Sequence, residues 1–379
     1  MSDDEGALAR CVGDVHRFRT TVWGRRPEHR RSGSSFGDLL DVDDVERSLV
    51  LLARRPGFRL VSDGASLPID SYTTSTRFGG RVVEQVADVD KVLDLVHGGA
   101  TLVLQGLQRT WLPLARFCDA LQAAISHPVQ ANAYLSPARA AAFTRHVDQH
   151  AVLALQVAGQ KHWRVDGLGE VEMEPGDVLY LPAGTPHEAR STATFSLHLT
   201  IGVLEVTARH VLHRALGGDG LARPLPLGFA LPQHRDETAA AIAAALTVAT
   251  ELLDGLGVDD IIDAEIALAC RRRRPLPAGR LRVAVDPTTV RNGSVLRRLR
   301  TAHVDSDGDR ATIEFDGRQL QLPGFARPAL DAVASADEVT VGSLPGLDID
   351  SQLVLARRLV REGLLARAST DGSAGTGGP

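Results

Sequence analysis

Three blocks between residues 132 and 202 decide the fold of this chain. They read NAYLSPARAAAFTRHVDQHAVLALQVAGQKHWRV (132–165), EPGDVLYLPAGTPHEA (174–189) and HLTIG (198–202). Short runs rich in Val, Leu, Tyr and Phe alternate with Gly and Pro, which predicts strands separated by turns. The predicted strands cover residues 129–135, 146–158, 161–165, 177–182 and 195–203. This pattern is typical of a β-sandwich or β-barrel.

Two histidines and an aspartate in these blocks form a candidate metal site. In a strand, residues i and i+2 point to the same face, so the sequence HVD projects His146 and Asp148 together, separated by roughly 7 Å along the backbone. A third ligand is needed from another strand, and His187 follows the turn-rich segment before it. Two histidines and one carboxylate on one side of an ion are the facial triad of non-haem Fe(II) oxygenases.

His150 is a rival ligand because it shares the predicted strand face with His146 and Asp148. Its Cα is expected to lie roughly 13 Å from that of His146, too far for both imidazoles to reach one ion. We therefore expect His150 to line the pocket or to face solvent.

The segment from Asn132 to Gly202 resembles the JmjC-type ribosomal oxygenases, a cupin branch of the Fe(II)/2-oxoglutarate dioxygenases. Five family blocks occur in order: NAYLSP, HVD, the LQVAGQKHW block, PGDVLYLPAGTPH and HLTI. The resemblance covers about 70 residues clearly and residues 23–119 more thinly. It implies an α+β fold: a double-stranded β-helix (cupin/JmjC jelly-roll) core, a helical dimerisation region and a C-terminal winged-helix-like domain.

The resemblance also assigns site residues. It implies that His146, Asp148 and His187 are the metal ligands, and that Lys161 binds the distal carboxylate of 2-oxoglutarate. It further implies that Asn132 and Tyr134 line the cosubstrate pocket. A buried dicarboxylate needs a fixed cation and polar donors, so the residue types suit these roles. From spacing alone, Lys161 would be read as an exposed turn lysine.

The expected cofactor and cosubstrates are Fe(II), 2-oxoglutarate and O2. In the implied reaction, oxidative decarboxylation yields succinate and CO2, and a substrate carbon is hydroxylated.

Other residues in the blocks leave alternatives open. His198 either contacts the cosubstrate pocket or is a hydrogen-bonded core histidine. Gln156 either contacts substrate or packs. Trp163 and Tyr180 are expected to be core aromatics, as most buried aromatics are.

Only two of the 42 basic residues are lysines, Lys91 and Lys161. One of the two falls where the resemblance requires a cation. An ammonium and a guanidinium differ in shape and hydration, so a pocket sized for lysine would not accept arginine freely.

Composition narrows the class of protein. The net charge of −5 provides no overall attraction for nucleic acid or an anionic membrane. Three scattered cysteines argue against a disulfide framework and for a reducing compartment. The N-terminus is acidic and no long apolar run occurs. We therefore expect a cytoplasmic protein that does not span a membrane.

The sequence on either side of this core predicts five regions in the whole chain. They are a mixed α/β region that completes the barrel (1–100), the JmjC/cupin catalytic core (101–206), a helical region expected to mediate dimerisation (207–278), a winged-helix-like domain (279–368) and a disordered tail (369–379). Helices are expected over residues 41–53, 238–257, 259–274, 325–337 and 350–367, and a hairpin over 312–322 with its turn at Asp316-Gly317.

Three functions are consistent with this sequence. The resemblance favours hydroxylation of an Arg or His side chain of a ribosomal protein by a homodimeric enzyme. The same scaffold could instead tailor a biosynthetic peptide. A non-catalytic cupin sensor with a nucleic-acid-binding winged helix is the third, supported by Arg357, Arg358 and Arg361 on one predicted helix. The arginine run 271–274 could bind RNA, but a solvated helix end is favoured.

The chain departs from the family beside the predicted ligands. Gln149 and Val147 stand where relatives often have an acidic and an aromatic residue. Both departures are expected to affect substrate choice rather than reaction class. The sequence does not distinguish hydroxylation from demethylation.

Overall fold

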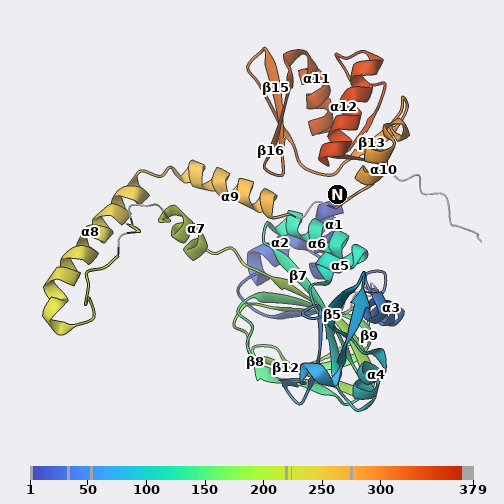
Figure 1. Cartoon of the computed structure of the whole chain (residues 1–379), viewed down its shortest axis with the longest axis vertical. Helices are drawn as coiled ribbons and strands as arrows, with labels where there is room; N and C mark the ends of the chain where they lie inside the picture. The colour runs from blue at the N-terminus through green and yellow to red at the C-terminus, as the bar shows by residue number, and fades with distance from the viewer. Residues whose placement is uncertain are drawn as a thin grey trace, which may run out of the picture. The chain divides into compact units, whose positions relative to one another are not determined.

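A computed structural model describes residues 3–31, 35–51, 54–217, 221–222, 224–273 and 276–368 of the chain (Figure 1). The chain divides into two compact units, residues 1–214 and 215–379. The predicted tail from residue 369 and the end of the arginine run at residue 274 lie outside the described residues.

The first unit is built on a ten-stranded antiparallel sheet. The order along its main path is β1-β11-β9-β12-β7-β6-β2-β3, with β10 paired to β9 and β8 paired to β12. Its strands are β1 (Glu28–Arg30), β2 (Phe58–Ser62), β3 (Ala65–Ser66), β6 (Thr101–Leu104), β7 (Val129–Ser136), β8 (Ala141–His146), β9 (Ala151–Val165), β10 (Gly169–Met173), β11 (Val178–Leu181) and β12 (His187–Val203).

The outer face of this sheet packs against helices. Strand residues such as Leu153, Leu155 and Leu199 share one buried apolar cluster with Leu8 of helix α1 (Asp3–Val12) and Leu121 of helix α6 (Leu112–Ile125). This layer fills one side of the sheet with apolar side chains. Buried polar side chains are therefore expected on the other side, which we call the inner face.

The inner face carries a smaller apolar cluster and most of the buried polar residues. Val152, Trp163, Val165 and Leu181 belong to that cluster. Buried polar side chains beside it include Ser136, Gln156, Lys161, His187, Ser191, Ser196 and His198.

The side chains of β9 that point inward change from even-numbered to odd-numbered residues along the strand. Gln156 and Lys161 both contribute buried polar side chains to the inner face, although they are five positions apart and strict alternation would place them on opposite faces. The change occurs at Gly159, which has φ +62°, and the pairing of β9 with β12 shifts register at the same level. A positive φ is easily adopted only by glycine, and a Cβ at this position would clash with the carbonyl oxygen of Phe195. The bulge therefore turns Lys161, Trp163 and Val165 inward.

Two helices lie between β6 and β7, ahead of the strands that the sequence predicts from residue 129. The short α5 (Leu107–Thr110) and the longer α6 follow β6, and Pro113 lies in the first turn of α6. Leu114, Phe117 and Leu121 of α6 are buried at helical spacing and pack into the outer-face cluster.

The other elements of the first unit are short. They are α2 (Val15–Arg17), the π-helical turn η1 (Phe18–Val22), α3 (Val42–Leu51), η2 (Ile69–Ser71), the two-stranded sheet of β4 (Thr73–Phe78) and β5 (Arg81–Ala87), α4 (Val89–His97) and α7 (Ala208–Ala215). Helix α3 confirms the helix predicted in residues 41–53, of which 52–53 lie outside the described residues.

The second unit begins with helices that bury none of their own side chains. Helices α8 (Arg235–Asp254) and α9 (Val258–Arg272) confirm the two helices predicted there, and the turn η4 (Pro232–His234) precedes α8. Their exposed apolar residues include Ile242, Leu246, Leu253, Val258, Ile262 and Ile266.

The C-terminal part of the second unit has its own apolar core of helices and small sheets. Its elements are α10 (Arg280–Val285), η5 (Pro287–Thr289), β13 (Val295–Arg298), β14 (His303–Ser306), β15 (Arg310–Phe315), β16 (Arg318–Pro323), η6 (Gly324–Ala326), α11 (Arg327–Ser335), β17 (Glu338–Thr340), α12 (Ile349–Glu362) and β18 (Leu365–Arg367). The predicted hairpin is confirmed, since β15 and β16 flank Asp316 and Gly317, which both have positive φ.

The last predicted helix ends earlier than expected. Helix α12 ends at Glu362, and Gly363 adopts φ +92° as its C-cap. The chain then pairs as β18 with β13. The extension of this helix to residue 367 was wrong, because a left-handed glycine ends the helix. The winged-helix identity of this part of the chain stays a prediction.

Within the described residues, no single helix has the length and apolar character needed to cross a membrane. The segments Pro232–Asp254 and Val258–Arg272, bent by 86° to one another, reach that length and composition only as a pair.

Candidate metal and carboxylate site

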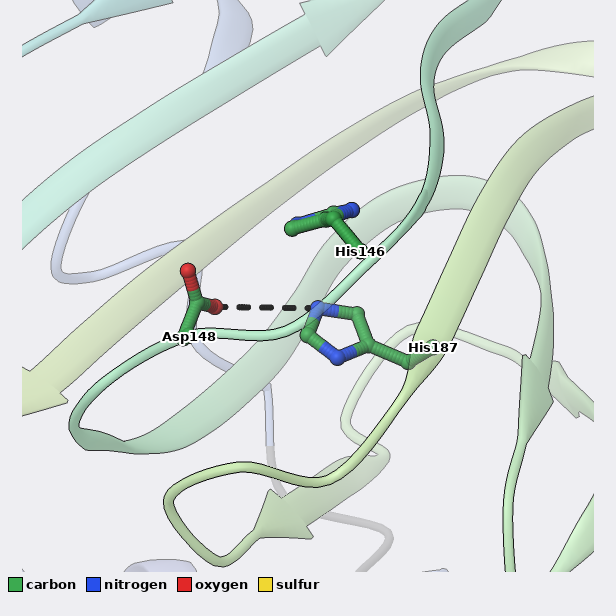
Figure 2. A group of neighbouring side chains, drawn as sticks. All are labelled: His146, Asp148 and His187. Carbon is green, nitrogen blue, oxygen red and sulfur yellow. Dashed lines mark ion pairs between the residues drawn. The ribbon is translucent and has the colours of Figure 1, made fainter.

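Three side chains from two neighbouring strands and a loop converge at one end of the inner face (Figure 2). His146 ends β8, Asp148 lies in the following loop, and His187 begins β12 opposite His146. One potential ligand atom from each residue lies within 4.8 Å of the others. The imidazole centroids are 4.4 Å apart, and Asp148 Oδ2 lies 3.6 Å from His187 Nε2. These atoms could bind a single metal ion.

Both histidines are oriented through their Nδ1 atoms. His146 Nδ1 lies 2.8 Å from the carbonyl oxygen of Thr144, and His187 Nδ1 lies 2.9 Å from that of Thr185. A carbonyl can only accept, so each Nδ1 carries the hydrogen and each Nε2 carries the lone pair that a metal requires. Such contacts fix both the tautomer and the ring orientation of metal ligands.

The electrostatics favour a neutral imidazole at His187. Burial lowers its pKa most, the neighbouring His146 lowers it further, and the Thr185 carbonyl and Asp148 oppose these effects. A neutral ring needs no deprotonation before it binds a cation. The side chain of Asp148 is 37% exposed whereas that of His187 is 6% exposed, so the group reaches solvent on its aspartate side.

The structure corrects how two of these residues are positioned. We predicted that His146 and Asp148 share one face of a continuous strand, but β8 ends at His146, and Asp148 lies in the loop before β9. The loop bends the chain, and the backbone oxygen of Asp148 accepts a hydrogen bond from Gly184. Among the described residues, His150 is not part of the metal-binding group, and its Nε2 lies 3.2 Å from Gln130 Nε2.

Lys161 is buried on the same inner face with no carboxylate partner among the described residues. Its side chain is 2% exposed, and its Nζ donates to Ser136 Oγ at 3.0 Å. Thr101 Oγ1 donates to the same oxygen at 2.9 Å. Burial lowers the pKa of Lys161 to about 8. The exposed turn lysine suggested by spacing alone is therefore wrong, because the bulge at Gly159 turns this residue inward.

Aromatic rings lie beside both the metal group and His198. The Trp163 ring is 5.9 Å from that of His187 and 5.6 Å from that of His198. Tyr134 stacks on His198 at 4.9 Å with an interplanar angle of 8°. Trp163 and Tyr180 are both buried, as predicted, but Trp163 also borders the site.

His198 is buried on this face, and its two predicted roles stay predictions. Among the described residues, its Nδ1 has no hydrogen-bond partner, and neither has the buried Nε1 of Trp163. Burial, and then the charge of Lys161, hold the pKa of His198 well below its usual value. This ring is therefore neutral, and it presents an unsatisfied nitrogen among the inner-face side chains.

Asn132, Tyr134 and Gln156 also lie on this face. Asn132 Oδ1 accepts from the backbone of Gly106 at 3.0 Å, which ties β7 to the start of α5. Burial raises the pKa of Tyr134, and hydrogen bonds with Thr200 and Arg59 lower it.

Gln156 Nε2 donates to the carbonyls of Ala158 and Gly159 and to Ser196 Oγ. These bonds support the packing role for Gln156, because they stabilise the bulge.

Sequence reasoning missed three polar residues around Lys161. Ser136 could have been found, since it continues the i, i+2 series of Asn132 and Tyr134 along β7. Thr101 and Ser191 gave no local signal, because Thr101 comes from a distant strand and Ser191 faces inward only after the register shift in β12.

The core of the first unit matches a known family model. Residues 107–169 and 166–211 match the JmjC domain. The predicted JmjC/cupin core is thereby confirmed, whereas the helical dimerisation region remains a prediction.

Curated relatives match part of the chain. The chain is 34% identical over 119 residues to the bifunctional lysine-specific demethylase and histidyl-hydroxylase NO66 of Branchiostoma floridae, covering 30% of this chain and 19% of that protein. It is 28% identical over 202 residues to ribosomal oxygenase 1 of Gallus gallus, covering 46% of this chain and 31% of the relative. The matched part therefore spans less than a third of the length of either relative.

Solved structures extend the likeness to nearly the whole chain. YcfD, a ribosomal oxygenase from Escherichia coli, aligns over 94% of this chain and 98% of its own, with a TM-score of 0.53 and 21% identity. The structure of YcfD in complex with cobalt and 2-oxoglutarate aligns with a TM-score of 0.51 and 22% identity, covering 93% of this chain and 97% of that one. At this identity the likeness shows a shared fold.

Proposed function

This chain is a JmjC-domain protein related to the ribosomal oxygenases, and from that premise we propose that it is an Fe(II)- and 2-oxoglutarate-dependent dioxygenase that hydroxylates a protein or peptide side chain. One observation carries the proposal. The His146, Asp148 and His187 group and the buried Lys161 lie on one inner face, so candidate ligands for a metal ion and a cation for a carboxylate occur on the same side of the sheet.

The donor set fits the proposed metal. Two imidazole nitrogens and one carboxylate, supplied from one side, leave the remaining coordination positions to small molecules, as in Fe(II) oxygenases. Fe(II) would supply the activation of O2, coupled to the conversion of 2-oxoglutarate to succinate and CO2. The chain itself contributes the orientation of both imidazoles through Thr144 and Thr185.

The inner face also fits the proposed cosubstrate. A buried ammonium without a carboxylate partner is costly, and an incoming carboxylate would offset that cost. Trp163 Nε1, Ser191 Oγ and His198 Nδ1 are further buried polar atoms on this face that have no hydrogen-bond partner in the described part of the chain. Unsatisfied polar atoms of this kind are rare in folded proteins unless a ligand or water completes them.

The proposed substrate is an Arg or His side chain of a ribosomal protein. Support comes from the names of the relatives, which include ribosomal oxygenases and a histidyl-hydroxylase. Mass spectrometry of ribosomal proteins from cells with and without the gene tests this, with the expected difference equal to one oxygen atom on one peptide. If every ribosomal protein is unchanged, the substrate assignment is wrong, and a biosynthetic peptide becomes the next candidate.

The sensor function stays the third candidate. On α12, Arg357 donates to the carbonyl of Val290, and Arg358 and Arg361 both pair with Glu362. The side chains of Arg358 and Arg361 are 49% and 59% exposed, so their charges still reach solvent.

Substitution of His146 by Ala tests the reaction class. We expect substrate-coupled succinate formation to be abolished, because the ion loses one of three ligands. His162→Ala is the matched control, since His162 pairs with Glu170 on a strand position that alternates with the inward-facing ones. An unchanged rate in His146→Ala would rule out the proposed reaction.

We also propose that the protein is a homodimer that covers the apolar residues of α8 and α9. Neither helix has a buried residue, and apolar side chains recur along both. Exposed apolar surface of this extent marks an interaction site. Sedimentation equilibrium should give twice the chain mass, and the double variant Leu246→Glu/Ile262→Glu should give the single-chain mass.

A further inference from the structure

A short arginine-rich stretch in the first unit has a charge opposite to that of the whole chain. It reads HRFRTTVWGRRPEHRR and covers residues 16–31, which we call the arginine segment. Six arginines against one glutamate give it a net charge of +5. Because the whole chain carries −5, the remainder carries −10. A local patch of this kind can attract a polyanion although the protein as a whole is acidic.

Four of the six arginines in the segment are exposed. They are Arg19, Arg25, Arg26 and Arg31. Arg19 donates from Nη2 to the carbonyl oxygen of Ala124 at 2.9 Å, and a carbonyl leaves the charge of the guanidinium uncompensated. Neither Arg19 nor Arg25 forms an ion pair with another residue in the described part of the chain. Their charges are therefore available to an external partner.

The carboxylates next to these arginines in the sequence are already engaged. Glu28 accepts two hydrogen bonds from Arg17, at 2.8 and 2.6 Å, and its side chain is only 17% exposed. Arg26 lies 3.5 Å from the same carboxylate, so two guanidinium groups share one negative charge. Asp14, just before the segment, accepts from the backbone nitrogen of Arg17 as the N-cap of α2. A surplus of positive charge remains at the surface.

Aromatic contacts fix the arginine segment to the sheet. Tyr180 of β11 meets the ring of Phe18 edge-on at 4.9 Å and stacks with that of Trp23 at 5.7 Å. Its hydroxyl accepts a hydrogen bond from the backbone nitrogen of Gly24 at 2.9 Å. Trp23 also stacks on His127 at 5.7 Å, with an interplanar angle of 17°. The turn after Trp23 is thus held at several points, so the arginines on it need little reordering when a partner binds.

The chemistry of the segment fits a nucleic acid better than a membrane. All residues from 16 to 31 are described, and none of the large apolar side chains among them is exposed. Binding at a membrane surface usually combines basic residues with apolar side chains that insert. A guanidinium matches the oxygens of a phosphodiester in a bidentate way. Because Trp23 already stacks on two protein rings, the contacts would be with the phosphate backbone rather than with bases.

We propose that the arginine segment is a binding surface for the phosphate backbone of a nucleic acid, with Arg19, Arg25, Arg26 and Arg31 as the phosphate-binding residues. Contacts of this kind fix position and orientation without reading the base sequence. The inference goes beyond the proposed function and does not depend on it. With about four phosphate contacts on an acidic chain, binding should be weak and strongly salt-dependent.

Fluorescence anisotropy of the full chain with a labelled polyuridine RNA of about 20 nucleotides tests this surface, with salt varied from about 50 to about 300 mM. For the wild type, the logarithm of the association constant should fall with the logarithm of salt concentration with a slope of about −3, because each neutralised phosphate of a single strand contributes about −0.7. In Arg25→Gln/Arg26→Gln the slope should be about −1.4. Arg19→Gln/Arg31→Gln is an independent pair with the same expected slope.

Arg358→Gln/Arg361→Gln on α12 is the matched control. It also removes two charges from exposed arginines, but at a site outside the arginine segment. This variant should bind RNA as the wild type does. A loss of binding confined to it would assign nucleic-acid binding to α12 and overturn the proposal. Unchanged slopes in both variants of the arginine segment would overturn it as well.

Two further ligands identify the source of the phosphate. Duplex DNA of about 20 base pairs should give a steeper slope, about −0.9 for each phosphate. Binding of either nucleic acid that weakens in both segment variants supports the proposal. Vesicles of equal parts phosphatidylserine and phosphatidylcholine should not bind, and binding to them without binding to RNA or DNA would overturn it. The unfolding temperature of both segment variants should equal that of the wild type. A common drop would trace the loss of binding to a structural defect and would also count against the proposal.

Discussion

His187 and Thr185 are joined by a 2.9 Å contact between Nδ1 and a carbonyl oxygen two residues earlier in the chain. His146 and Thr144 repeat the same relationship on the paired strand. The two contacts direct both Nε2 atoms, whereas Asp148 is held by its loop. Of the three candidate ligands, Asp148 is thus the one least constrained by the sheet.

Asp148→Ala should lower Mn(II) affinity by about a hundredfold or more, because losing a ligand costs at least as much as losing an outer partner of one. Calorimetry of metal binding measures this. Asp166→Ala is the control. Asp166 is also a partly exposed aspartate, but it pairs with Arg145, the residue before His146. Equal affinities for the two variants would exclude Asp148 as a ligand.

Lys161→Arg should raise the 2-oxoglutarate concentration needed for half-maximal turnover and leave Mn(II) affinity intact. A guanidinium is larger than an ammonium and cannot keep the single bond to Ser136 within the same volume. Lys91→Arg should behave as wild type. An unchanged apparent affinity in Lys161→Arg would remove the special role given to this lysine.

Binding of 2-oxoglutarate should weaken above about pH 8. Burial lowers the Lys161 pKa to about 8, so the free protein loses the ammonium charge above that pH, and binding must then be coupled to proton uptake. The neighbouring His198 does not interfere, because its pKa lies well below its usual value and it stays neutral in this range. Affinity measured from pH 7 to 9.5 should fall toward tenfold per unit above pH 8, and a flat profile would contradict the assignment.

Stability of the ligand-free protein should rise with pH between about 8 and 10.5. The folded-state pKa of Lys161 is lower than its unfolded value, so in this window the unfolded chain binds more protons. Below pH 8 the buried charge costs the folded state about 3 kcal/mol in full. Denaturant unfolding of wild type and Lys161→Met should therefore differ at pH 7 in favour of the variant and converge at high pH. A constant difference would show that Lys161 is not buried as a charge.

Gly159→Ala should destabilise the protein by more than about 2 kcal/mol, through a positive φ and a clash with the Phe195 carbonyl. It should also impair 2-oxoglutarate binding, because the bulge turns Lys161 inward. Gly79→Ala is the control, since Gly79 also has a positive φ but has open space around it. That variant should cost about 1 kcal/mol at most. Equal losses of stability in the two variants would show that the clash is unimportant.

The sequence predicted those parts of the site that local motifs encode. His146, Asp148 and His187 were identified correctly as neighbours, since the first two are adjacent in the chain and the third follows a recognisable turn. The prediction that one continuous strand positions both His146 and Asp148 was wrong, because β8 ends at His146 and Asp148 lies in the following loop.

Alternation alone also failed for Lys161 and Ser191. At the bulge, the inward-pointing side chains of β9 and β12 change between odd-numbered and even-numbered residues. Counting alternate residues from before Gly159 therefore does not predict which side chains point inward after it. Thr101 could not have been found from the sequence, because its contact with Ser136 depends on which strands become neighbours in the sheet.

The bulge in β9 separates two groups of inward-facing side chains. The three candidate metal ligands come from β8, its loop and β12, whereas Lys161 comes from the second half of β9. Deleting one residue between Gln156 and Lys161 would present His162 inward and Lys161 outward, without changing any candidate metal ligand. One deletion would therefore replace the inward-facing ammonium by an imidazole and leave the candidate metal site as it is.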